Sequence, residues 1–232
     1  MDKHHWPLPE LALPGLHKSL VERVLQLSEV DHETSVLDIG CGSGAWLARL
    51  ARQGFKRLHG VDNQSFTTFP LAEEARASFS CSHADLNNDP DLGLGSARFG
   101  LITAIEVIEH MHNPGRFLGH AARHLDDNGY FLITTPNLHS VRARIRFALT
   151  GKLQGFDPTD APAELTHLYP VFLTCLDRLL ARYQLETVER WTFPPRKGAG
   201  TRLTRRLAAD VLEMMLPNQY PGDILCVLVR RC

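Results

Sequence analysis

A glycine-rich stretch, VLDIGCGSGAW (Val36 to Trp46), limits what this chain can fold into more than any other feature. Its first residues are an apolar, β-branched run typical of a buried strand, and the residues after the glycines follow a helical pattern that stops at Gly54. Gly40, Gly42 and Gly44 lie between the two runs, where residues without a Cβ let the backbone turn tightly and approach a ligand. The stretch therefore predicts a strand, loop and helix that cradle a nucleotide-like cofactor.

The spacing of these glycines favours one class of cofactor. GxGxG is one residue tighter than the dinucleotide fingerprint GxGxxG, and an acidic residue, Asp38, lies on the strand two positions before Gly40. We therefore expect adenosylmethionine rather than NAD. A glycine-rich loop alone is weak support, because glycine turns also occur for structural reasons, and the prediction depends on the motifs that follow.

The rest of the chain alternates between strand-like and helix-like patterns, which predicts an α/β fold with a mostly parallel sheet. No low-complexity linker divides the pattern, so we expect a single domain over residues 1–232, with a helical cap at 1–30 and a lid insertion at 138–165. Strands are expected at 35–40, 57–62, 78–86, 99–106, 129–137, 184–193 and 222–231, and helices at 15–30, 44–54, 114–129 and 170–183.

Acidic residues follow two of the expected strands. Asp62 ends HGVD, about twenty residues beyond the glycine loop, where a carboxylate can accept hydrogen bonds from both ribose hydroxyls of a nucleoside, and Asn63 lies beside it. Asp85 in ADLNND could accept from an adenine amino group while Leu86 packs against the ring. Either feature alone is more often a solvated strand end, but their order along the chain supports a nucleoside site.

The motifs VLDIGCGSG, GVD, ADL, FGLITAIEVIEH and LDDNGYFLITTPN together resemble the class I adenosylmethionine-dependent methyltransferases, over residues 35–137. The resemblance implies a doubly wound, Rossmann-like sheet of seven strands in the order 3-2-1-4-5-7-6, with the last strand antiparallel. It also implies the cofactor contacts. Asp38 and the three glycines would hold the methionine part and Asp62 the ribose; Asp85 and Leu86 would hold the adenine, and the backbone at Ile105 would face the cofactor.

Within this family, EVIEH, PGRFL and ITTPN are most similar to the branch that contains the ubiquinone-pathway O-methyltransferases. The small-RNA 2′-O-methyltransferases also carry an ExxEH stretch and a later histidine, with which they hold a divalent ion. His167, in ELTHLYP, stands in the corresponding place of this chain. Substrate does not follow from fold, so the acceptor stays open.

Two interpretations of EVIEH are possible. If a helix begins near Glu106, then Glu106, Glu109 and His110 project from one face and, with His167, could bind Mg²⁺ or Mn²⁺ to polarise an acceptor hydroxyl. Alternatively, the carboxylates are merely favoured by the positive end of the helix dipole. Without a metal, His110 or His167 is the candidate general base, with Glu109 as the third catalytic candidate. Other histidines are set aside as ligands, because they lack ligand-like spacing and most are expected on surfaces: His4, His5, His59, His83, His112, His120, His124 and His139.

Two basic segments follow the fifth expected strand. In 141–152, Arg142, Arg144, Arg146 and Lys152 alternate with apolar residues, which predicts a lid helix that covers the acceptor. The resembled ubiquinone branch has a membrane-contacting insertion here, so peripheral contact with anionic lipid is the alternative. The run at 194–207 could serve a phosphate-bearing acceptor or RNA, or be solvated.

Composition narrows the function further. A net charge of -1 argues against nucleic acid as a partner, and the five cysteines without a CxxC pair favour a reduced, cytoplasmic protein. We expect methyl transfer from adenosylmethionine, with adenosylhomocysteine as product, to a hydroxyl of a small molecule: a quinone precursor, a glycan or a natural-product intermediate. An RNA ribose methyltransferase and a non-catalytic binding protein are the alternatives. Neither the oligomeric state nor the acceptor follows from the sequence.

Overall fold

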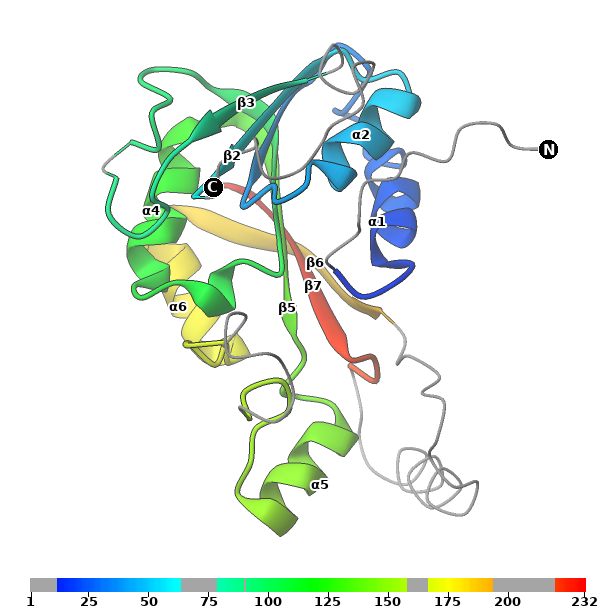
Figure 1. The fold of residues 1–232 in the computed structure, drawn as a ribbon, viewed down its shortest axis with the longest axis vertical. Coiled ribbons are helices and arrows are strands. Elements are labelled where there is room, and N and C mark those ends of the chain that lie inside the picture. The colour runs from blue at the N-terminus through cyan, green and yellow to red at the C-terminus, as the bar shows by residue number, and fades with distance from the viewer. Residues whose placement is uncertain (1–11, 64–78, 90, 158–166, 194–219) are drawn as a thin grey trace, which may run out of the picture.

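The computed structural model describes residues 12–63, 79–89, 91–157, 167–193 and 220–232 and contains one seven-stranded sheet (Figure 1). The strands are β1 (Ser35–Ile39), β2 (Arg57–Asp62), β3 (Ser80–His83), β4 (Phe99–Ile105), β5 (Leu125–Pro136), β6 (Leu185–Phe193) and β7 (Ile224–Arg231). Their order is β3-β2-β1-β4-β5-β7-β6, and β7 runs antiparallel to both of its neighbours. The predicted fold class, strand order and antiparallel last strand are confirmed.

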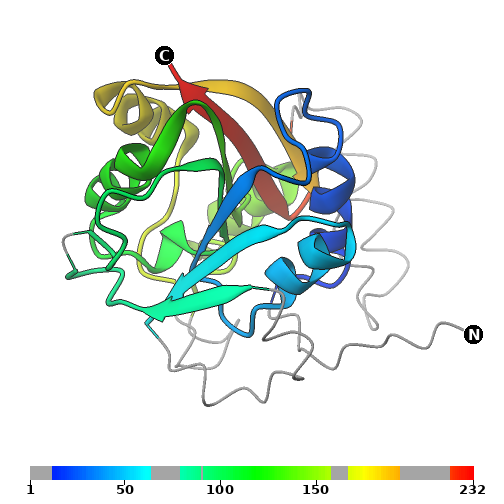
Figure 2. The same cartoon turned by 90° about the horizontal axis from the view of Figure 1, so that it is seen from above.

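Helices cover both faces of the sheet. Figures 1 and 2 show α1 (Leu16–Val24) and α2 (Ala45–Arg52) on one face and α4 (Pro114–His124) and α6 (Leu173–Arg182) on the other. A short 3-10 helix, η2 (Ile108–His110), follows β4. The predicted lid helix is α5 (Val141–Thr150), which projects beyond the carboxyl end of β5 (Figure 1).

Alternating residues of the central strands build two separate cores. In β1, Val36 packs with Leu20 and Trp46 on the α1 and α2 face, whereas Leu37 packs with Phe117 and Leu176 on the opposite face. This follows from the period of two in a strand, and it explains why strands covered on both faces are apolar throughout. Each of these large side chains contributes about 1.5–3 kcal/mol by leaving water.

Two predicted helices extend well beyond the ends of the observed ones. The helix expected at 114–129 ends at His124, because β5 already begins at Leu125 and pairs with Phe99 before the register shifts between Phe99 and Leu101. Gly129 belongs to this irregular part of the strand, where an added Cβ would lie 3.0 Å from the carbonyl oxygen of Phe99. It is therefore a close-approach glycine within a strand rather than a helix stop.

The helix expected at 15–30 ends at Val24. The amides of Gln26 and Leu27 donate to the carbonyl oxygens of Arg23 and Val24, which are three residues earlier in the chain. The last apolar residues of the predicted helix therefore form tight turns.

The strand order places the site. The chain leaves β1 toward β2 and β3 on one side and later continues through β4 and β5 on the other, so the carboxyl ends of β1 and β4 lie at the point where the winding reverses. Within the described ranges, no helix combines the length and the apolar character needed to cross a membrane. The basic run at 194–207 and the early His4 and His5 lie outside the described residues.

Candidate active site

The glycine loop after β1 has the backbone shape that its sequence predicts. Gly40, Gly42 and Gly44 have φ values of 77°, 49° and 75°, a left-handed conformation that other residues rarely adopt. Packing adds a second requirement, because a Cβ on Gly40 would lie 2.5 Å from Val107 Cγ2 and one on Gly44 would lie 2.6 Å from the Phe79 ring. The loop thus packs closely between Val107, which follows β4, and Phe79, which precedes β3.

This loop opens on a small pocket at the carboxyl ends of β1 and β4. The pocket brings together four predicted cofactor residues: Asp38, Gly40, Gly42 and Ile105. The other lining residues are Ala12, His17, Cys41, Ser43, Ala45 and Trp46. A buried carboxylate beside backbone amides in a left-handed loop fits the ammonium and carboxylate groups of the methionine part of adenosylmethionine.

Asp38 is held by a chain of buried polar groups. The Thr103 hydroxyl donates to Asp38 Oδ1 at 2.6 Å, and Trp46 Nε1 donates to Thr103 Oγ1 at 3.0 Å. Burial is the main reason that the pKa of Asp38 rises to about 7; the Thr103 hydrogen bond opposes the rise and the charge of Asp62 adds to it. A cationic group in the pocket would favour the ionised carboxylate.

Asp62, at the end of β2, is buried and accepts a hydrogen bond from the Gly42 amide at 2.8 Å. The carboxylate therefore ties the second strand to the glycine loop. Asn63, next in the chain, is exposed. The assignment of Asp62 and Asn63 to the ribose stays a prediction.

Asp85 and Leu86 lie in the turn after β3. The Asp85 carboxylate accepts from the Asn87 amide at 2.9 Å and from the Asn88 side chain at 2.7 Å, and these bonds, the Asn88 side chain first, lower its pKa. Leu86 is buried in the core under α4 and α6. Asp85 thus stabilises its own turn, and its role toward adenine stays a prediction.

Sequence reasoning missed two aromatic residues that line this pocket and one residue, Thr103, that holds Asp38 from outside its lining. Trp46 and His17 are buried, and their rings meet edge to face with centroids 5.6 Å apart. Thr103 is the polar residue of an otherwise apolar strand, and this break in the apolar pattern could have identified it from the sequence. The sequence carried no comparable signal for His17, because it lies on the apolar face of α1 among ordinary core positions.

Glu106 does not begin a helix, so the expected helical face over Glu106, Glu109 and His110 does not form. Its φ is 55°, and its amide donates to the carbonyl oxygen and hydroxyl of Thr134. The carboxylate accepts a 3.3 Å hydrogen bond from the Leu13 amide, and burial raises its pKa. The left-handed turn at Glu106 separates it from the residues that follow.

Glu109, His110 and His167 do converge. One ligand atom from each lies within 4.8 Å of the other two, and the two imidazole rings meet edge to face with centroids 4.8 Å apart. Glu106, the fourth predicted ligand, is not a member of this group.

Backbone hydrogen bonds bring His167 to this place. The amides of Leu168 and Tyr169 both donate to the Glu109 carbonyl oxygen at 2.8 Å. The ring of Phe156 packs against His167 with centroids 5.2 Å apart. The segment before α6 is thus pinned onto η2, with its histidine beside the glutamate.

Glu109 is fully buried, and neither of its carboxylate oxygens makes a hydrogen bond of acceptable geometry among the described residues. Burial, followed by the charge of Glu106, raises the pKa of Glu109 well above its ordinary range, and the Thr135 hydroxyl opposes the rise. A buried carboxylate with two imidazoles is a donor set that suits a divalent metal ion. A protonated histidine beside Glu109 would, like a metal ion, favour the ionised form of this carboxyl.

Two acidic side chains hold the predicted lid at two points, one inside the lid itself and one on the body of the protein. Asp157, which is buried, forms ion pairs with Lys152 at 2.7 Å and with Arg146 at 3.8 Å. Asp223, just before β7, accepts from the Gln154 side chain at 3.3 Å and pairs with Arg142 at 4.0 Å.

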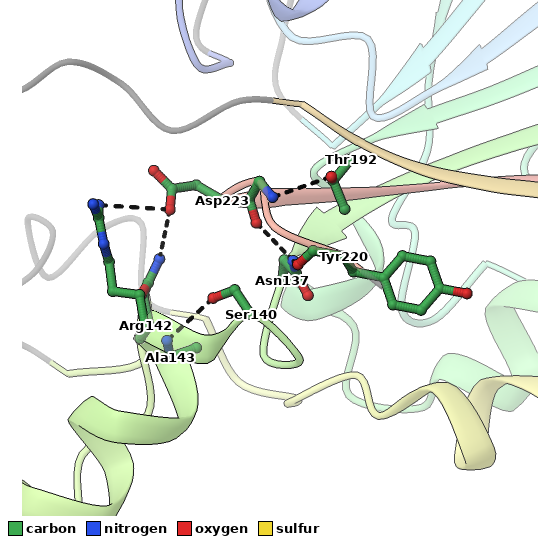
Figure 3. Close-up of polar contacts among 9 residues, drawn as sticks. Asn137, Ser140, Arg142, Ala143, Thr192, Tyr220 and Asp223 are labelled. Atoms are coloured by element: carbon green, nitrogen blue, oxygen red, sulfur yellow. Dashed lines mark hydrogen bonds and ion pairs between the residues drawn. The ribbon is translucent and has the colours of Figure 1, made fainter. Parts of the chain in front are cut away.

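Figure 3 shows the second of these points. Beside it, the Asn137 side chain donates to the carbonyl oxygens of Tyr220 and Gly222, and Ser140 accepts from the Ala143 amide at the start of α5 (Figure 3). The ends of β5, α5 and β7 are therefore joined by polar contacts.

The sequence predicted that most of the histidines without ligand-like spacing lie on surfaces, and two of them do not. His120 and His124 are buried, and they contact Arg123 and the Ala97 carbonyl oxygen, respectively. His139 accepts from the Leu173 amide at the start of α6 at 3.1 Å. These are structural roles, because each ring satisfies a neighbouring polar group.

Comparison with known proteins places this geometry in a family. A family model described as a methyltransferase domain matches residues 13–190, which is more than half of the chain. The chain belongs to this methyltransferase family. It is an adenosylmethionine-dependent methyltransferase of class I, as the ordered motifs implied.

Relatives with assigned activities match only part of this methyltransferase. The ubiquinone biosynthesis O-methyltransferase of Azorhizobium caulinodans is 32% identical over 105 residues, which are 44% of this chain and 40% of that protein. For the first four such relatives, the chain spans 40% to 47% of their length.

Solved structures share the fold of this methyltransferase at low identity. The CcbJ methyltransferase from Streptomyces caelestis has a TM-score of 0.62 at 14% identity, covering 95% of this chain and 91% of that one. Magnesium protoporphyrin IX methyltransferase from Synechocystis PCC 6803, solved with bound SAH, has a TM-score of 0.61 at 13% identity, covering 94% and 84%.

Proposed function

We propose that this methyltransferase transfers the methyl group of adenosylmethionine to a hydroxyl of a small-molecule acceptor. The observation that carries the proposal is the cluster of Glu109, His110 and His167. Glu109 and His110 follow β4, the strand whose last residue, Ile105, lines the pocket that we assign to the cofactor. The names of the partial relatives, which are O-methyltransferases, support the same chemistry.

Methyl transfer from a sulfonium is an in-line displacement, so the enzyme must align the acceptor oxygen with the methyl carbon, exclude water and accept the hydroxyl proton. His110 and His167 are the candidate bases, because imidazole titrates near neutral pH. Glu109, buried between them and the sheet, would orient an imidazole and stabilise its protonated form. The lid helix α5 would cover the acceptor and keep water out.

Glu109, His110 and His167 would also hold a divalent ion, Mg²⁺ or Mn²⁺, and leave open positions on it. When bound, such an ion supplies a positive charge that lowers the pKa of a nearby hydroxyl. Glu106 would then not bind the ion, and its negative charge would act at a distance by raising the pKa of Glu109.

Release of adenosylhomocysteine tests the proposal. We would incubate the full chain with adenosylmethionine and a panel of acceptors that differ in the nucleophile: a dihydroxybenzoate, an oligosaccharide, an aromatic amine and an RNA oligonucleotide. We expect turnover with the phenol or the sugar hydroxyl, and loss of it in His110→Ala and His167→Ala. Turnover with the amine alone would contradict hydroxyl methylation, and turnover with RNA alone would favour the ribose alternative.

A further inference from the structure

Two cysteines with no relation in the sequence meet beside the cofactor pocket. Cys41 lies in the glycine loop, lines the pocket and is only 6% exposed. Cys81 lies in β3 and is partly exposed. Both belong to the core on the α1 and α2 face of the sheet.

Gly60 is the reason that they meet. It is in register with Cys81 on the neighbouring parallel strand, so the Cys81 side chain points to the face on which a Gly60 side chain would lie. A Cβ on Gly60 would be 2.6 Å from the Cys41 sulfur and 3.0 Å from the Cys41 Cβ. The Cys41 side chain therefore fills the space that Gly60 leaves empty, next to Cys81, and the two thiols share a hydrogen bond.

The two thiols differ in character. The hydrogen bond from Cys41 lowers the pKa of Cys81, against the effect of partial burial. The same bond, followed by burial and the charge of Asp38, raises the pKa of Cys41. Cys81 is thus the more exposed and the more easily ionised partner, as the thiol that reacts first with an oxidant must be.

We propose that Cys41 and Cys81 form a redox-active pair that a hydroperoxide converts into a disulfide, and that this disulfide weakens cofactor binding. The Cys81 thiolate attacks the peroxide and becomes a sulfenic acid as the oxygen–oxygen bond breaks and water leaves. The Cys41 sulfur then attacks the sulfenic sulfur, and the hydroxyl leaves as water with the Cys41 proton. Two thiols and one hydrogen peroxide give one disulfide and two waters.

The glycine loop transmits the change to the cofactor. The amides of Gly40 and Cys41 both donate to the Val61 carbonyl oxygen, at 2.7 and 3.2 Å, and the Gly42 amide donates to Asp62. A disulfide brings the sulfurs to about 2.05 Å, so the Cys41 side chain is drawn from the pocket wall toward β3. The proposal rests on cofactor binding by this loop and not on the identity of the acceptor.

The test uses the full chain with Cys175→Ser and Cys232→Ser, which removes the exposed thiols. After treatment with hydrogen peroxide, tryptic digestion without reductant should yield residues 24–49 linked to residues 77–98, since each of these peptides contains one cysteine. By calorimetry, adenosylhomocysteine should bind at least fivefold more weakly after oxidation, and dithiothreitol should restore its affinity.

Cys81→Ser in the same background is the matched control, because Cys81 is not among the pocket residues. It should give no linked peptide, and its affinity for adenosylhomocysteine should not respond to peroxide. If the peptides that contain Cys41 and Cys81 are recovered only as separate peptides after peroxide treatment, the proposal is overturned. If the linked peptide forms but the affinity for adenosylhomocysteine does not change, the coupling to the cofactor is overturned. Failure of the reduced protein to bind adenosylhomocysteine would overturn that coupling and the cofactor assignment together. Failure to find an acceptor affects neither readout.

Discussion

The Thr103 hydroxyl donates a 2.6 Å hydrogen bond to Asp38 Oδ1, and both side chains are buried. Asp38 and Thr103 are in register on β1 and β4, so their side chains point to the same face of the sheet. Trp46, on α2, donates to the same hydroxyl and closes the chain of contacts. Among the described residues that line the pocket, the ionisable ones are Asp38, His17 and Cys41. The strand order thus positions Asp38.

The affinity for adenosylhomocysteine should rise between pH 6 and pH 8. The pKa of Asp38 is about 7 in the unliganded protein, and the ammonium group of the methionine part binds its ionised form better. Calorimetry at several pH values measures this rise. Asp38→Asn should bind more weakly and lose the step, and a step that persists in this variant would assign it to another group.

The free energy of unfolding should show the opposite trend from the same group. Because the folded-state pKa of Asp38 is raised, its contribution is fully present below the ordinary aspartate pKa and is lost as the pH rises through about 7. Urea unfolding of the wild type and of Asp38→Asn over this range isolates the contribution. Parallel curves for the two proteins would show that Asp38 is not the group responsible.

Asp62→Ala should weaken cofactor binding by about 1–3 kcal/mol, because it removes the expected partner of two ribose hydroxyls. The structure adds a second effect, since Asp62 also accepts from the Gly42 amide. Asp62→Asn keeps an acceptor oxygen for this amide and separates the two roles. Unchanged affinity for adenosylhomocysteine in Asp62→Ala would remove the ribose assignment.

Gly40→Ala should destabilise the protein more than Gly93→Ala. Both residues have a positive φ, 77° and 71°, which costs an alanine about 1–2 kcal/mol. An alanine Cβ at position 40 would also overlap Val107, at 2.5 Å, whereas no atom lies within 4 Å of one at position 93. This overlap adds about 1–3 kcal/mol. Equal losses in chemical denaturation would mean that Val107 moves away at no cost.

Addition of Mn²⁺ or Mg²⁺ should raise the melting temperature if the cluster holds a metal. At one hundred times the dissociation constant, a ligand that binds only the folded state stabilises it by about 2.7 kcal/mol. Glu109→Ala and His167→Ala should abolish the rise, and EDTA should remove activity that either ion restores. Indifference of both readouts to ion and chelator would leave His110 and His167 as metal-free base candidates.

The lid helix should not hold the protein on membranes. Arg142, Arg146 and Lys152 form ion pairs with Asp223 or Asp157, which leaves less free positive charge for anionic lipid. Cosedimentation with vesicles rich in anionic lipid should therefore be negligible. Neutralising Arg142, Arg144 and Arg146 together should alter turnover but not the amount of protein recovered with the vesicles. Robust, salt-sensitive binding would instead favour a membrane-embedded acceptor and assign a lipid contact to Phe147 and Leu149, which are 51% and 80% exposed.

EVIEH shows where local patterns stop being informative. The spacing of Glu106, Glu109 and His110 predicts one helical face only if the backbone is helical from the first of them. In the structure Glu106 has a left-handed backbone, its amide donates to Thr134 on β5, and the helix that follows is a single 3-10 turn. That contact lies far away in the sequence, so no spacing rule could include it.

The sequence by itself determined the buried strands and the glycine loop through local requirements, because short apolar runs specify strands covered on both faces and only glycine tolerates the backbone of the loop. Its ordered motifs implied the strand order through their resemblance to the class I methyltransferases. Tertiary structure decided how distant side chains meet. His167 reaches Glu109 because the next two amides bond to the Glu109 carbonyl oxygen. Cys81 reaches Cys41 because Gly60, in register with Cys81, leaves the space that the Cys41 side chain fills. Both meetings depend on strand register and on backbone hydrogen bonds between remote segments, and a linear pattern does not record either.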